Sequence, residues 1–234
     1  QRIAYYSRAC LHEFRTRYPF DYGQSQGYLQ LFRSEYDVEL AQPALAVLRD
    51  AGIVHREVSA EECVQIEPGL QWAREAPLSG LYLPDDEAGD CARFTRELRA
   101  ICEKNGVTFR FDTQVTALDV QGNAVRGVRI ASERGAGVLE ADAVVVALGV
   151  ESAALLAPLG VRIPLYPVKG YSATLPVTDD EKAPRAALMD ESLKTAITRF
   201  GPNLRVAGTA ELGNRRTTLR EQALQTLMKV LDDW

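Results

Sequence analysis

Gly149 is the residue whose position points most directly to contact with a ligand. It follows the apolar run AVVVAL at 143–148, which predicts a buried strand, and it precedes a helix-forming stretch. Ligands of α/β sheets collect at the carboxyl ends of strands, where a residue without a side chain lets the backbone approach a nucleotide. A turn without a ligand is an equally good interpretation of this glycine taken alone.

The phosphate-binding loop that should accompany such a strand is not evident. A dinucleotide site uses G-x-G-x-x-G directly after a strand, with the N-terminus of the next helix holding the pyrophosphate. The nearest candidate, GAGVLE at 135–140, lacks the third glycine and precedes a strand instead of a helix. We therefore interpret it as a turn.

Two cations have neighbours that suit an anionic ligand. Lys169 lies in YPVKGYS, between two tyrosines and beside a glycine, and could stand over a cofactor or be a solvated surface charge. Arg199 is an isolated cation in the apolar stretch ITRF. It could bind a carboxylate ligand, or form an ion pair with Asp190 or Glu191.

Other chemistries find little support in the residue types. The sequence assembles no catalytic triad, paired carboxylates or metal cluster, so any redox chemistry would be carried by a cofactor. Four cysteines without a C-x-x-C pair favour reduced core thiols in a cytoplasmic protein. A net charge of −5 with scattered basic residues gives no nucleic-acid footprint. No apolar stretch approaches the roughly 18 residues of a membrane span.

Helical periodicity and end signals predict the helices that must position these residues. A capping box of Ser59 with Glu62 begins one helix, Asp90 caps another, and Thr218 with Glu221 is expected to cap the last. The expected helices cover 2–16, 36–51 with Pro43 as a kink or a later start, 60–67, 90–104, 151–160 and the C-terminal stretch.

Alternating apolar residues predict the strands. Gly201-Pro202-Asn203 is a strong hairpin signal between the last two of them. The expected strands cover 27–32, 79–84, 107–120, 124–130, 138–149, 165–177 as one long strand or a pair, 194–200 and 204–211.

The order of these elements predicts a mixed α+β and α/β fold with two kinds of architecture. The flanks look like antiparallel sheet with covering helices, while the middle looks like part of a nucleotide-binding α/β unit with a β-meander. We expect residues 1–89 and 161–234 to form one domain and residues 90–160 to form part of another.

Several stretches together resemble a known family. YLQLFRSE, LPDDEAGDCARFT, GVTFRFDTQV, YPVKGYSATLP and RVAGTAE, in this order, resemble the bacterial D-amino acid dehydrogenases of small-subunit type. Those enzymes belong to the FAD-dependent amine oxidoreductases, which include D-amino acid, glycine and sarcosine oxidases. The resemblance spans the chain, but the family's glycine-rich FAD loop and its C-terminal substrate arginine are missing. It implies an internal fragment in which 1–89 and 161–234 are parts of the substrate domain and 90–160 is an incomplete part of the FAD-binding domain.

The resemblance also implies site residues. The backbone of Val115 would meet the adenine, although a core strand is the alternative interpretation of that position. Ala147, Leu148 and Gly149 would pass close to the FAD pyrophosphate or ribose.

The stretch YPVKGYS receives a role in the same way. Lys169 and Gly170 would lie near the flavin, and Tyr171 would lie near the substrate cavity. With Arg199 as the candidate partner of a substrate carboxylate, these residues complete the expected site, in which the catalytic residues remain unassigned and no metal is expected.

The function implied by the resemblance is oxidation of D-amino acids such as D-alanine to 2-oxo acids and ammonia, with hydride transfer to flavin. Electrons would pass to a quinone-type or respiratory-chain acceptor, and the protein would be cytoplasmic, or peripheral on the cytoplasmic face of the inner membrane. Two alternatives stay open: an oxygen-using glycine or sarcosine-type oxidase, and a non-catalytic substrate-domain fragment or interaction module. We expect the isolated fragment to be inactive and colourless.

Overall fold

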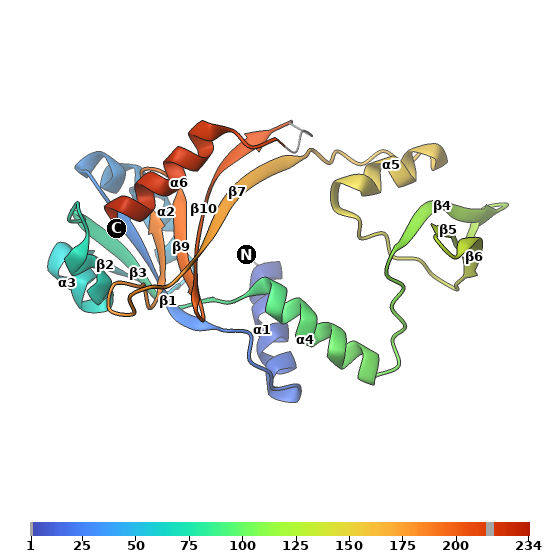
Figure 1. The fold of residues 1–234 in the computed structure, drawn as a ribbon, viewed down its shortest axis with the longest axis horizontal. Helices are drawn as coiled ribbons and strands as arrows, with labels where there is room; N and C mark the ends of the chain where they lie inside the picture. Colours follow the sequence, from blue (N-terminus) through green and yellow to red (C-terminus); the bar gives the residue numbers. More distant parts are fainter. Residues whose placement is uncertain (1, 214–217) are drawn as a thin grey trace. The chain divides into compact units, whose positions relative to one another are not determined.

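The computed structural model describes residues 2–213 and 218–234, which divide into two compact units (Figure 1). The sheet unit comprises Gln1–Cys102, Gly170–Glu211 and Arg216–Trp234, and the meander unit comprises Glu103–Lys169 and Leu212–Arg215. The combination of a mixed sheet, a meander and helices confirms the predicted α+β and α/β class.

The sheet unit is built on a seven-stranded sheet with the order β2-β3-β1-β8-β9-β10-β7. Strand β1 pairs in parallel with β8 and antiparallel with β3, so segments far apart in sequence meet at the centre of the sheet. The strands are β1 Ser25–Phe32, β2 Arg56–Ser59, β3 Ser79–Ala88, β7 Val168–Pro176, β8 Ala187–Asp190, β9 Thr195–Phe200 and β10 Asn203–Leu212.

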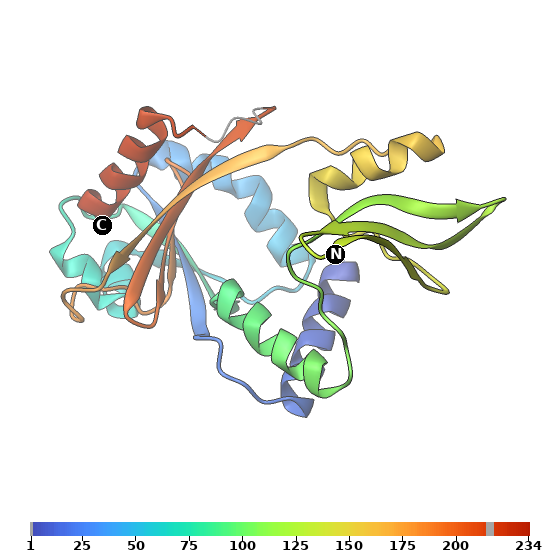
Figure 2. The ribbon, with the colours of Figure 1, turned by 45° about the vertical axis from the view of Figure 1, so that its right-hand side comes forward.

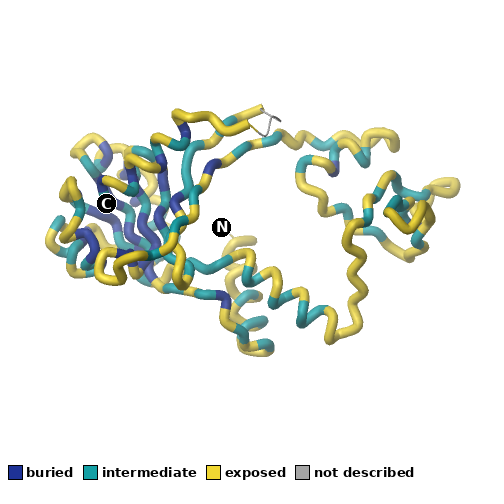
Figure 3. Tube along the Cα trace, viewed as in Figure 1, coloured by how far each residue is buried: buried dark blue, intermediate teal, exposed yellow. Residues whose placement is uncertain are grey.

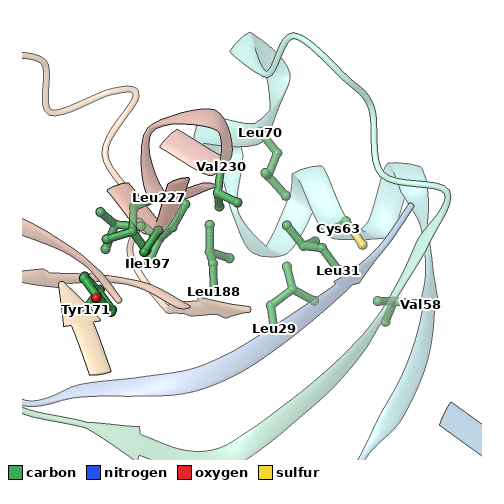
Figure 4. Close-up of a cluster of buried hydrophobic side chains, with 12 residues drawn as sticks. Leu29, Leu31, Val58, Cys63, Leu70, Tyr171, Leu188, Ile197, Leu227 and Val230 are labelled. Carbon is green, nitrogen blue, oxygen red and sulfur yellow. The ribbon is translucent and has the colours of Figure 1, made fainter. Parts of the chain in front are cut away.

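Helices cover this sheet on both faces (Figure 2). Leu29 and Leu31 of β1 pack in one cluster with Leu227 and Val230 of α6 (Figure 4). Phe32 belongs to a second cluster with residues of α2. The helical segments are α1 Arg2–Arg17, α2 Glu35–Asp50, α3 Ala60–Ile66, the 3-10 helix η1 Pro68–Trp72, α4 Cys91–Lys104 and α6 Glu221–Asp233.

Helix ends follow the capping chemistry that the sequence predicts, with one exception. Ser59 and Glu62 form the expected capping box at α3, and the Asp90 carboxylate accepts a hydrogen bond from the Arg93 N–H at the start of α4. Helix α6 differs, because its N-cap is Arg220, which makes no side-chain cap hydrogen bond. The predicted cap by Thr218 is therefore wrong.

Helix α2 begins eight residues before Pro43, so a start at or after that proline is excluded. Its N-cap is Ser34, which forms a capping box with Asp37. The Asp37 carboxylate also accepts hydrogen bonds from the Ser192 hydroxyl at 2.7 Å and from the Arg33 N–H at 3.1 Å. This one carboxylate therefore joins the start of α2 to the loop that follows β8.

We expect acid to weaken the protein partly through Asp37. Burial tends to raise the pKa of Asp37, but hydrogen bonds from Ser192, Ser34 and the Arg33 N–H outweigh burial and lower the pKa. A lowered folded pKa contributes stability above the unfolded pKa of about 3.9, and this stability is lost as the pH falls through the folded value. In a plot of the free energy of unfolding against pH, Asp37→Asn should reduce the slope at acid pH by up to about 1.4 kcal/mol per pH unit. Urea titrations between pH 2 and 7 test this, with exposed Asp50→Asn as a control that keeps the wild-type slope.

The meander unit contains three antiparallel strands: β4 Thr113–Gln121, β5 Ala124–Ser132 and β6 Gly135–Glu140. The helix expected at 151–160 consists of α5 Ser152–Leu156 between the 3-10 turns η2 Gly149–Glu151 and η3 Ala157–Leu159. Side chains of the meander unit are mostly exposed or half-buried, whereas the buried residues gather in the sheet unit (Figure 3).

Two strand predictions in the meander unit are wrong. Residues 107–112 and 143–148 are not strands, and Val145, in the centre of the supposedly buried run, is 89% exposed. A strand forms only when its backbone groups pair with a neighbour, and neither segment pairs with a strand among residues 2–213 and 218–234. Apolar residues alone therefore do not make a strand here.

In the sheet unit, β2 and β8 are strands that the sequence does not reveal, because four residues each are too few for a clear alternation. The cysteines are free, as expected, but only Cys63 is buried, whereas Cys10 and Cys91 are exposed. The prediction of core thiols is wrong for those two. Among the helices of the described residues, none is both long and apolar enough to cross a bilayer.

Candidate functional site

Gly149 lies at a turn, as predicted, but the segment before it is irregular. Its φ of +55° is in the left-handed region, which a residue without Cβ enters at little cost. A Cβ built at this position would meet no atom within 4 Å, so backbone conformation, and not crowding by the chain, accounts for the glycine. The backbone of this turn is open.

The neighbours of Gly149 are held by one side chain. The Ser152 hydroxyl oxygen, from a buried serine at the start of α5, accepts a hydrogen bond of 3.1 Å from the Leu148 N–H. Ala147 and Leu148 are themselves exposed. The turn is therefore held by the Ser152 hydrogen bond, while its main chain remains exposed.

Val115 lies on β4, an edge strand of the three-stranded meander. It is half-buried and lies opposite Ile130 of β5, next to an irregularity of the register that ends at Ala117. One side of an edge strand has backbone groups that no sheet neighbour uses. This geometry fits two interpretations equally well: the expected backbone contact with an adenine, and a plain core strand.

Lys169, Gly170 and Tyr171 are consecutive residues of β7, which is one long strand and not a strand pair. Because side chains alternate along a strand, Lys169 and Tyr171 share one face. Lys169 is half-buried, Gly170 is exposed and Tyr171 is buried. A contact through Gly170 would therefore come from its open backbone, since nothing lies within 4 Å of a Cβ built there.

Tyr171 has a structural partner. Its hydroxyl donates a 2.8 Å hydrogen bond to the Glu211 carboxylate, and Arg220 lies 3.6 Å from the other oxygen of that carboxylate. The tyrosine ring, 4% exposed, belongs to the cluster under α6. These contacts tie β7 to β10 and to the residue that precedes α6.

Replacing Tyr171 by phenylalanine should lower the free energy of unfolding by about 1.5–3 kcal/mol, because it removes a part-buried hydrogen bond to a charged acceptor and keeps the ring. Chemical denaturation measures the change. Tyr36→Phe, at a ring that is 66% exposed on α2, is the matched control and should stay within about 0.5 kcal/mol of wild type. Equal stability of Tyr171→Phe and wild type would contradict the structural role.

Arg199 forms an ion pair, but not with the predicted partners. Its Nη2 lies 2.5 Å from Asp180 Oδ1, and its Nε donates to the Gly201 carbonyl at 2.9 Å. The predicted pair with Asp190 or Glu191 is wrong, because Asp190 is bound by Arg33. A substrate role for Arg199 stays a prediction.

In the sheet unit, a cluster of polar side chains around Arg33 could not be predicted from the sequence. Arg33 Nη2 lies 2.6 Å from Asp190 and 2.8 Å from Asp233, and its guanidinium stacks 4.6 Å from the centre of the Trp234 ring. The Asp190 side chain is fully buried. These residues come from three segments far apart in the sequence, the loop after β1, the end of β8 and the end of α6, so no local pattern could identify them.

Comparison with known proteins shows the family. The model of the family described as "DAO: FAD dependent oxidoreductase" matches residues 1–234. The chain belongs to the FAD-dependent oxidoreductase family. FAD is accordingly the cofactor that its site residues must be tested against.

Relatives in this family carry a specific name. The chain is 43% identical over 232 residues to a D-amino acid dehydrogenase of Vibrio vulnificus strain YJ016, covering 99% of this chain and 55% of the relative. It is 47% identical over 234 residues to one of Cereibacter sphaeroides strain ATCC 17029, covering 99% of this chain and 52% of the relative. The chain thus spans about half the length of the curated relatives it matches.

Some solved structures have a similar fold. Glycine oxidase from Bacillus cereus ATCC 14579 aligns with a TM-score of 0.82 at 20% identity, covering 98% of this chain and 62% of that one. L-proline dehydrogenase from P. horikoshii aligns with a TM-score of 0.76 at 18% identity, covering 94% and 58%. At these identities the likeness concerns the fold.

The residues present fit an FAD contact of limited extent. The open turn at Gly149, the exposed backbone of Ala147 and Leu148, and the edge position of Val115 are compatible with a nucleotide lying along main chain. The predicted residues divide between the units, since Gly170, Tyr171 and Arg199 belong to the sheet unit and the others to the meander unit. Within the described ranges, no group of three or more His, Cys, Asp and Glu side chains could hold a metal.

Proposed function

We propose that the full-length protein is an FAD-dependent dehydrogenase that oxidises D-amino acids, D-alanine among them, to 2-oxo acids and ammonia. The observation that supports this most is the identity of 43–47% along 99% of the chain to relatives named D-amino acid dehydrogenase. Bound FAD would supply the hydride acceptor, so the protein's own residues need to bind and orient rather than to abstract protons.

The residues of the meander unit are proposed to hold the nucleotide part of FAD. Val115 would contact the adenine through its backbone, and Ala147, Leu148 and Gly149 would lie along the pyrophosphate or ribose. Their exposure and the open turn support this role. The interior part of an FAD-binding domain, proposed at 90–160, includes all four.

The residues of β7 and β9 are proposed to act at the flavin and the substrate. Lys169 and Gly170 would approach the flavin, Tyr171 would lie near the substrate cavity, and Arg199 would contact the amino acid. Arg199 would then exchange its exposed partner Asp180 for the substrate carboxylate, which costs little because exposed ion pairs are weak. The two flanks, 1–89 and 161–234, would form the substrate domain.

Substrate class is tested with the purified full-length protein and an artificial electron-accepting dye. D-alanine should reduce the dye much faster than L-alanine, glycine or sarcosine. Turnover of sarcosine or glycine equal to that of D-alanine would reject the D-amino acid assignment in favour of a glycine or sarcosine-type oxidase, the candidate whose fold is shared by the glycine oxidase structures.

The electron acceptor is tested in the same preparation. We propose an acceptor other than oxygen, a quinone of the respiratory chain, which the word dehydrogenase in the relatives' names supports. We also propose peripheral attachment at the cytoplasmic face of the inner membrane, where such quinones lie. A soluble quinone analogue should sustain turnover without oxygen consumption. Stoichiometric peroxide release would instead identify an oxidase. The 234-residue chain alone should be colourless and inactive as a fragment, and bound flavin in it would contradict that expectation.

A further inference from the structure

Glu67 is a buried carboxylate with one oxygen left over. It is 1% exposed and follows the last residue of α3. Its Oε2 accepts hydrogen bonds from the N–H groups of Arg185 at 2.8 Å and Ala186 at 2.9 Å. Its Oε1 is buried and has no hydrogen-bond partner among the described residues. A buried acceptor left in this way costs free energy and indicates a donor that the protein itself does not provide.

Glu67 also lines a pocket of about 240 Å³ in the sheet unit. The apolar lining comes from η1, the central strands and α6, and three of its side chains, Leu70, Leu188 and Ile197, gather beside α6 (Figure 4). The volume is below the roughly 300–1,000 Å³ of pockets for drug-sized ligands, so the pocket suits a small metabolite.

Two indoles, two cations and the Asp232 carboxylate also line the pocket. Trp72 and Trp234 both line the pocket, and the Lys182 ammonium lies 5.5 Å from the centre of the Trp72 ring. Lys182 lies 3.6 Å from Asp179, and Arg74 also lines the pocket. These cations can turn towards a new anion at little cost.

Arg74, like Lys182, is held by an exposed ion pair. Arg74 lies 3.4 Å from Asp232, with the two side chains 71% and 60% exposed. Ion pairs as exposed as this one contribute about 0–1 kcal/mol. The pocket thus combines a buried acceptor, an apolar wall and two cations that are available for rearrangement.

We propose that this pocket binds a small zwitterion with an apolar body, as an apolar amino acid is, with its ammonium on Glu67 and its carboxylate at Lys182 and Arg74. The ammonium supplies the donor that Oε1 lacks, and the apolar body lies against the leucine and isoleucine side chains. Burial raises the pKa of Glu67, although hydrogen bonds from the Ala186 and Arg185 N–H groups oppose that rise, and a bound cation favours the charged form. None of the proposed FAD contacts lines the pocket, so this is a second site.

The pocket has two other conceivable occupants, and each is an outcome of the test. One is ordered water alone. The other is protein, because relatives are about twice as long as this chain. A crystal structure of the full-length protein soaked with L-leucine separates these cases: leucine in the pocket supports the proposal, while water only, or side chains filling the pocket, overturns it.

Binding in solution is measured on the full-length protein with L-leucine, which the proposed D-amino acid oxidation does not consume. Both tryptophans of these 234 residues line the pocket, so leucine should change the tryptophan fluorescence saturably, and Trp72→Phe should reduce that change. Isoamylamine lacks the carboxylate and 4-methylpentanoate lacks the ammonium, so each should bind more weakly than leucine. Absence of saturable leucine binding would overturn the proposal and leave the proposed enzyme activity untouched.

Variants assign the binding to the pocket. Glu67→Gln keeps the shape but replaces an acceptor by a donor, and should weaken leucine binding by about tenfold or more. Glu57→Gln, the same change at an exposed residue of β2, is the matched control and should bind as wild type. If Glu67→Gln does not fold, Lys182→Gln and Arg74→Gln, both at exposed positions, should each weaken leucine but leave isoamylamine unchanged. Wild-type leucine affinity in every folded variant would show that leucine binds elsewhere.

Discussion

Replacing Arg33 by alanine is expected to lower the free energy of unfolding by about 3–5 kcal/mol, because it leaves a buried carboxylate without its counter-charge. The Asp190 side chain is fully buried, and both Nε and Nη2 of Arg33 donate to its Oδ2, at 2.8 and 2.6 Å. The Trp234 indole N–H donates to the same oxygen at 2.7 Å. Removing the guanidinium therefore leaves the buried Asp190 carboxylate with fewer donors and without its counter-charge.

The neighbouring charges of Arg33 increase this cost. Asp233 lies 2.8 Å from Nη2, and although burial tends to raise its pKa, hydrogen bonds and charges from Lys229 and Arg33 lower it. Without Arg33, two carboxylates from β8 and α6 would face each other across one cavity. The cluster thus connects the central sheet to the last turn of α6.

Urea denaturation at neutral pH measures this prediction as a shift of the midpoint at constant slope. Arg74→Ala is the matched control: it removes the same type of side chain from the exposed pair with Asp232, and should cost about 1 kcal/mol or less. Comparable losses for Arg33→Ala and Arg74→Ala would contradict the argument that burial sets the cost.

The sequence suffices to predict elements whose determinants are neighbours in the chain. The capping box at α3 depends on Ser59 and Glu62, three positions apart, and the β9–β10 hairpin depends on the turn at Gly201, whose φ is +60°. The buried stripe of α6, which includes Leu227 and Val230, follows from helical periodicity. In each case, local backbone and side-chain chemistry determines the structure.

The sequence does not suffice where the determinant is a distant partner. Arg33 and Asp190 are 157 positions apart, and nothing in either local sequence selects one for the other. The apolar run at 143–148 carries the composition of a buried strand, but pairing decides whether a strand forms, and the composition contains no information about a neighbour. The same distinction between local and distant determinants applies to the candidate site. The turn at Gly149 can be predicted from the sequence, whereas the partners of Arg199 and Tyr171 cannot.

Gly149→Val should remove most of the flavin from the full-length protein and lower D-amino acid turnover by at least about tenfold. The change has two effects on this turn. It forces a β-branched residue to adopt a φ of +55°, which costs about 1–2 kcal/mol, and it places a side chain where the proposed pyrophosphate contact requires bare backbone. The ratio of flavin absorbance to protein absorbance in the purified variant measures the first outcome, and dye reduction measures the second.

Gly122→Val separates these two effects. Gly122, in the turn between β4 and β5, has a φ of +61°, and a Cβ built there, like one at Gly149, meets no atom within 4 Å. Both variants therefore carry the same backbone strain within the same unit, and only Gly149 lies at the proposed cofactor contact. Wild-type flavin content in Gly122→Val together with flavin loss in Gly149→Val supports the contact. Equal flavin loss in the two variants would mean that the turn at Gly149 acts only through backbone strain, and wild-type flavin content in both would mean that the nucleotide lies elsewhere.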